Sequence, residues 1–170
     1  MKKIIAILSL VAIPFLIQLA AACSITKAIY KYDDNPQVTA KFMPLKHKSL
    51  TDVYFTVTSS KGQHLWFTFD WGNGFSKERL VSSKTDPAND NWKPQDPDLN
   101  KDRLLLDMDF YTFDKTLKTS LGKISASATA PDYIFIPDLA PTLWYLRDAS
   151  IFSDYQLGRA MFTLSECEGV

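Results

Sequence analysis

The sequence has few of the residues on which common catalytic and metal sites depend. Of its 170 residues, two are histidine and two are cysteine. Nucleophilic catalysis needs a nucleophile, a base and an orienting group. The only imidazole bases are His47 and His64, and the chain has no Gly-x-Ser-x-Gly motif. The sequence therefore predicts a protein that is not an enzyme, with no catalytic residue, no metal site and no cofactor.

The chain also lacks an excess of charge of either sign. It contains 19 Lys and Arg and 19 Asp and Glu residues, so its formal net charge is zero. Domains that bind nucleic acid carry a clustered excess of basic side chains. We therefore expect no nucleic-acid partner.

Runs with helical periodicity are missing after residue 23, whereas alternating runs are frequent. Residues 53–58 and 63–71 alternate between two faces around the turn SSKG, a pattern that predicts a β-hairpin. The expected class is all-β: an antiparallel, jelly-roll-like β-sandwich over residues 51–170, with a tether and first strands in residues 23–50. Further strands are expected near residues 37–45, 103–114, 115–121, 123–128, 132–137, 140–148 and 158–166.

The one long apolar run stands at the N-terminus. Lys2 and Lys3 precede a nearly continuous apolar stretch over residues 4–19, and three alanines follow at positions 20–22. This order is typical of an export signal, and the run is also long enough to span a membrane. We expect residues 1–22 to be a signal peptide or membrane anchor, and the protein to be exported to the cell envelope.

Cys23 follows the three alanines directly, and this segment resembles the lipobox of bacterial lipoproteins. The resemblance implies that Cys23 is lipidated and that the protein contacts the membrane through its N-terminus. The family prefers Leu where this chain has Ala20. Two alternatives stay open: a periplasmic protein with a Cys23–Cys167 disulfide, and an uncut membrane helix.

Three later segments resemble the accessory β-sandwich modules of bacterial membrane proteins of glycan assembly. They are LWFTFDWGNGFSKERLV (65–81), IPDLAPTLWYLRDASIF (136–152) and LGRAMFTLSE (157–166). The chain departs from the family pattern at Arg147 and Asp148, which are adjacent. The resemblance implies a non-catalytic module with a saccharide or an envelope protein as its partner.

Aromatic residues are the candidates for saccharide contact, because an aromatic ring offers a flat apolar surface for stacking. Tyr54 and Trp66 lie on the outward faces expected for the hairpin, and Tyr111 lies on the outward face of the strand near 103–114. We predict that these three residues bind the ligand. On the same later strand, Asp107 and Asp109 are interpreted as a polar outer face and not as a catalytic pair.

Residues 86–102 form a polar, proline-rich segment that predicts a long exposed loop. It supports an alternative function, that of a periplasmic inhibitor or immunity-type lipoprotein that binds a hydrolase or toxin. The expected partner contacts are Asp90, Trp92, Asp96 and Asp98. Oxygen ligands from Asp96 onward have some of the spacing of a calcium loop, but Lys101 stands where that loop requires glycine.

Overall fold

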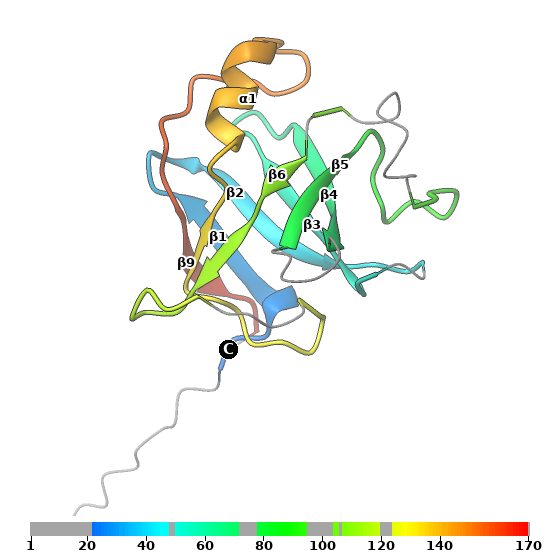
Figure 1. The fold of residues 1–170 in the computed structure, drawn as a ribbon, viewed down its shortest axis with the longest axis vertical. Coiled ribbons are helices and arrows are strands. Elements are labelled where there is room, and N and C mark those ends of the chain that lie inside the picture. Colours follow the sequence, from blue (N-terminus) through cyan, green and yellow to red (C-terminus); the bar gives the residue numbers. More distant parts are fainter. Residues whose placement is uncertain are drawn as a thin grey trace, which may run out of the picture.

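The computed structural model describes residues 22–47, 50–71, 78–94, 104–105, 107–119 and 124–169, except for the side chain of Trp71. These residues form one antiparallel sheet and one α-helix (Figure 1). The strands are β1 (Ala28–Tyr32), β2 (Asn35–Pro44), β3 (Val53–Thr58), β4 (His64–Trp71), β5 (Glu78–Ser83), β6 (Met108–Asp109), β7 (Tyr111–Phe113), β8 (Tyr133–Phe135) and β9 (Phe162–Cys167); the helices are the 3-10 turn η1 (Ile25–Lys27) and α1 (Leu139–Leu146).

The sheet curls into a barrel that closes on itself. Its strand order is β6-β5-β4-β3-β2-β1-β9-β8-β7, so β6 and β7 stand at its two ends. Only Phe110 separates these two strands, and its amide donates to the Glu78 carbonyl on β5 at 3.3 Å. The two ends are therefore one bent strand that pairs with β5 on one side and with β8 on the other.

The antiparallel all-β class expected from the sequence is confirmed. Each strand pairs with its neighbour in the chain, which makes the connectivity up-and-down. The crossed connections of a jelly roll do not occur among the strands that the structure describes. The β3–β4 hairpin forms where the alternation predicted it, and β1 pairs with both β2 and β9 in the middle of the sheet order.

Aromatic side chains fill the barrel interior. Phe42, Phe55, Phe69 and Phe110 contact one another with ring centroids between 5.1 and 6.2 Å apart. Most of these contacts are edge-to-face, the arrangement that the ring quadrupole favours. A barrel of this strand number has an interior just wide enough for its own side chains. A binding site is therefore expected at an end of the barrel or on its outer face.

Residues 84–94 fold back over the outer face of β3, which buries this strand on both sides. Leu45, Tyr54 and Trp92 form a second hydrophobic cluster there, separate from the barrel core. The Trp92 indole N–H donates to the Ser83 hydroxyl at 3.0 Å. This cover explains why five consecutive residues of β3 are buried, although strand alternation alone would bury every second one.

The prediction of a strand over residues 140–148 is wrong, because most of this segment forms helix α1. Leu139, Ala140 and Leu143 are buried on one side of the helix, which is a helical and not an alternating spacing. Pro141 lies in the first turn, where its missing amide breaks no helical hydrogen bond. The strands expected at 115–121 and 123–128 are also not formed by the described residues, which make turns and an isolated bridge at Thr119.

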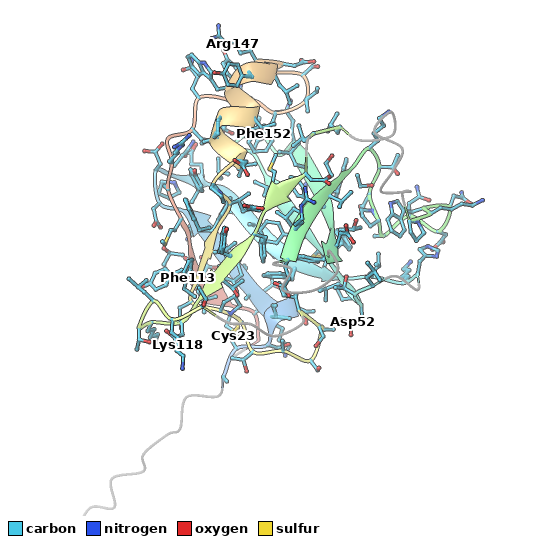
Figure 2. All side chains as sticks on the ribbon, viewed as in Figure 1. Cys23, Asp52, Phe113, Lys118, Arg147 and Phe152 are labelled. Atoms are coloured by element: carbon cyan, nitrogen blue, oxygen red, sulfur yellow. A yellow bond between two sulfur atoms is a disulfide. The ribbon has the colours of Figure 1, made fainter. Side chains whose placement is uncertain are left out.

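Cys23 and Cys167 are joined by a disulfide, with their Cα atoms 5.8 Å apart. An acylated cysteine carries its lipid on the same sulfur atom, so the predicted lipidation of Cys23 is not compatible with this bond. The disulfide lies at the end of the barrel opposite α1 (Figure 2). The segment expected to act as signal or anchor lies outside the described residues, apart from Ala22. In the described part of the chain, no helix is long and apolar enough to cross a membrane.

Candidate functional site

Strands β7 and β8 carry four aromatic side chains on the outer face of the barrel. Tyr111 pairs with Phe135, and Phe113 pairs with Tyr133. The residues between them, Thr112 and Ile134, are buried, so alternation directs the four rings outward. All four are half-buried, and we call Tyr111, Phe113, Tyr133 and Phe135 the aromatic face.

The aromatic face runs into a cavity of about 530 Å³ at the barrel end that holds the disulfide. This end pocket is lined by Ile25 of η1, by the end of β7 and by residues of the segments 114–119 and 124–132. Figure 2 shows Phe113 and Lys118 at this end of the molecule, near Cys23. Phe113 belongs to both the aromatic face and the end pocket, so the two form one continuous site.

The end pocket has an apolar floor and a polar rim. Ile25, Ile124 and Ala130 are buried and form the floor. Asp114 and Lys118 stand at the exposed rim. A pocket of this volume with an apolar lining and a few placed polar groups has the composition of a small-molecule site.

Asp132 supplies a partly buried carboxylate to this pocket. Its side chain is 26% exposed, and the Lys115 Nζ atom lies 4.0 Å from its Oδ1 atom. Burial, and to a smaller extent the negative charge of Asp132, raises the pKa of the Tyr30 hydroxyl. That hydroxyl is neutral and donates to the Pro131 carbonyl at 3.0 Å. The Asp132 carboxylate therefore faces the pocket as a hydrogen-bond acceptor.

Asp114 has a structural role at the rim. Its Oδ1 atom accepts hydrogen bonds from the Thr116 hydroxyl and from the amides of Thr116 and Lys118. These bonds, with the Thr116 hydroxyl first, lower the pKa of Asp114. The carboxylate thus stays ionised and holds the turn that forms one wall of the pocket.

Of the three residues predicted to bind a ligand, the structure places one in this site. Tyr111 lies on the aromatic face, where its hydroxyl donates to Asp109 at 3.4 Å. The prediction for Tyr54 is wrong, because residues 84–94 cover its ring and leave it 3% exposed. Trp66 is half-buried against the same cluster and stacks on His64 with centroids 6.0 Å apart. Strand β5 lies between β4, which carries Trp66, and the bent strand β6–β7. Trp66 is therefore not part of the aromatic face that contains Tyr111.

The burial of Tyr54 predicts a loss of stability in alkaline solution. Burial, the charge of Asp86 and a hydrogen bond to Asp86 raise the Tyr54 pKa above its ordinary value of 10. The folded state then holds this proton more tightly than the unfolded state, so the stabilisation is present below about pH 10 and is lost as the pH rises further. Urea unfolding at about pH 8 and about pH 11 should show a smaller alkaline loss for Tyr54→Phe than for the wild type. Tyr145→Phe, on a ring that is 83% exposed, is the control and should leave the loss unchanged.

The predicted partner contacts in the acidic segment divide into three groups. Asp90 is exposed and forms an ion pair with Lys46 at 3.1 Å. The prediction that Trp92 contacts a partner is not supported, because its ring is 5% exposed and holds the segment onto the sheet. Asp96 and Asp98 lie outside the described residues.

Asp109 of β6 and Asp107, which precedes this strand, both lie near Arg79 of β5. Asp109 lies opposite Arg79 in the strand register, and Asp107 forms an ion pair with Arg79 at 3.5 Å. Throughout the described ranges, no three or more His, Cys, Asp or Glu side chains are grouped so that they could hold a metal ion.

Sequence reasoning missed Phe113, Tyr133, Phe135 and Asp132. The usable signal was the repeated pattern Tyr-x-Phe at residues 111–113 and 133–135, which places two rings on the same face of each strand. Without the register that pairs these strands, the four rings could not be assigned to one surface.

The fold and site define a class: a packed up-and-down barrel that carries an aromatic face outside its core. Comparison with family models, with curated proteins and with solved structures found no match to the chain.

Proposed function

We propose that this protein is an exported, non-catalytic binding module of the cell envelope, and that its ligand is a saccharide. The observation that carries the proposal is the continuity of the aromatic face with the end pocket through Phe113. Aromatic rings supply flat apolar area for the faces of sugar rings. The Asp132 carboxylate and the threonine hydroxyls of the pocket supply hydrogen-bond partners for sugar hydroxyls.

The disulfide supports the proposed location. Disulfides persist in oxidising compartments such as the bacterial periplasm and are rare in the cytosol. The bond agrees with the export predicted from residues 1–22. It favours a periplasmic protein, or one held by an uncut N-terminal segment, over a lipid on Cys23.

Phe113→Ala is expected to weaken saccharide binding roughly tenfold, because it removes the ring shared by the two halves of the site. Isothermal titration with cellotriose, tri-N-acetylchitotriose and soluble peptidoglycan fragments provides the measurement. Tyr145→Ala removes an exposed ring at the opposite end of the barrel and should leave the affinity unchanged. If none of these probes binds the wild-type protein at millimolar concentration, the saccharide proposal is wrong.

A further inference from the structure

We infer that the sugar recognised in the end pocket carries an N-acetylated amino group, which the Thr112 hydroxyl and the Asp132 carboxylate recognise. The inference rests on the proposed saccharide function and names the class of sugar. Three features of the pocket lead to it: a buried hydroxyl without a partner, an apolar floor and a rim whose two acids are balanced by Lys118 and the neighbouring Lys115.

The Thr112 hydroxyl is the first feature. Thr112 is 6% exposed and lines the end pocket. Within the part of the chain that the structure describes, its hydroxyl makes no hydrogen bond. Buried hydroxyls nearly always have a partner. Among the described side chains, only Thr56 has a polar atom that is both sealed from solvent and without a hydrogen-bond partner. The Thr112 oxygen also has no partner, so it is not sealed from solvent and is reachable from the pocket.

Asp132 lines the same pocket as Thr112 and has the complementary chemistry. The Asp132 amide donates to the Phe113 carbonyl at 3.0 Å, which ties the two strand ends together. A carboxylate accepts hydrogen bonds, whereas a hydroxyl can donate one. The trans amide of an acetamido group offers an N–H donor on one edge and a carbonyl acceptor on the opposite edge, so one edge can meet the carboxylate while the other accepts from the hydroxyl.

The apolar floor of the pocket favours the methyl group of an acetamido substituent. Ile25, Ile124 and Ala130 offer no hydrogen-bonding side chain at the bottom of the pocket. A sugar hydroxyl placed against them would lose its water without gaining a partner, which is unfavourable. The methyl of an acetamido group gains from the same burial. The floor therefore favours the N-acetylated sugar over one with a hydroxyl at that position.

The charge of the rim argues for a neutral group. Asp114 and Lys118 carry opposite charges, and Asp132 has Lys115 at 4.0 Å. With no excess of positive charge, the rim gives a carboxylated ligand no clear advantage. The pocket lining holds two acids, Asp114 and Asp132, and one lysine, Lys118. Lys115, which pairs with Asp132 from outside the lining, balances the second acid, so a free ammonium gains little either. An uncharged acetamido group fits this balance.

The test compares tri-N-acetylchitotriose with cellotriose, which has the same β-1,4 backbone but hydroxyls in place of the acetamido groups. By isothermal titration, the N-acetylated trimer should bind at least tenfold more tightly. Thr112→Val should lower that affinity roughly fivefold and should lower the affinity for cellotriose by a smaller factor. The matched control is Thr68→Val, at a half-buried position on β4 that does not line the pocket.

Saturation-transfer NMR on the wild-type protein provides a second readout that needs no variant. The acetamido methyl protons should receive the strongest transfer if they lie on the apolar floor. Equal affinity for the two trimers, or stronger transfer to the ring protons than to the methyl, would overturn the inference and leave the saccharide proposal standing. Binding of neither trimer would instead count against the proposed function itself.

Discussion

Replacing Cys23 and Cys167 together by serine is expected to lower the free energy of unfolding by about 4 to 5 kcal/mol. The disulfide joins residues 144 positions apart, so it closes nearly all of the described chain into one loop. In the chain-entropy model, the stabilisation by a disulfide grows with the length of the closed loop. Guanidinium unfolding of the variant and of the oxidised wild type measures the difference.

The same loss should follow when the wild-type protein is reduced by a dithiol, which breaks the bond without changing any other side chain. The serine variant should not respond to the dithiol, and this insensitivity is the control. A loss below about 1 kcal/mol in both experiments would show that the pairing of β1 with β9 holds the chain ends without the bond.

Loss of the disulfide should also affect the end pocket, because the N-terminal segment forms part of it. The Cys23 carbonyl accepts from the Ala130 amide at 2.8 Å, and the Ile25 amide donates to the Ala128 carbonyl at 3.0 Å. Without the disulfide, the N-terminal segment would be held against the pocket by these two hydrogen bonds and by the burial of Ile25. We therefore expect the pocket to loosen before the barrel unfolds.

The part of the fold that the sequence predicts is the part that local alternation determines. The β3–β4 hairpin and the strands β8 and β9 follow from period-two patterns, in which apolar residues recur on one face. Helix α1 did not follow, because eight apolar-rich residues fit a buried strand as well as a short helix. Only the packing of Leu139 and Leu143 against the core decides between them.

The candidate site was less predictable, because it depends on pairings between distant segments. Tyr111 was recognised from its position on an outward face, but its neighbour Phe135 comes from a strand 24 residues further along the chain. Tyr54 shows the opposite case. Its outward position was correctly derived, yet residues 84–94 cover that outer face, and strand alternation contains no information about a covering loop.

Trp92→Ala is expected to lower the free energy of unfolding by about 3 kcal/mol, because it removes a large buried side chain. The indole packs on Leu45 and Tyr54, and its N–H donates to the Ser83 hydroxyl at 3.0 Å. Urea unfolding measures the loss. The control is Trp144→Ala on α1, whose ring is 42% exposed and contacts the Arg147 guanidinium at 4.4 Å. An exposed contact of this kind contributes below about 1 kcal/mol.

The two tryptophan variants also distinguish two roles for Trp92: holding residues 84–94 onto β3, or contacting a partner protein. If Trp92 holds residues 84–94 onto β3, Trp92→Ala should expose Tyr54 and reduce the alkaline loss of stability that its burial predicts. If Trp92 instead contacts a hydrolase or toxin, the variant should lose that partner in co-purification while its unfolding midpoint stays at the wild-type value. A stability loss no larger than that of Trp144→Ala would contradict the anchoring role. It would favour the inhibitor alternative, because the tryptophan would then be dispensable for the fold.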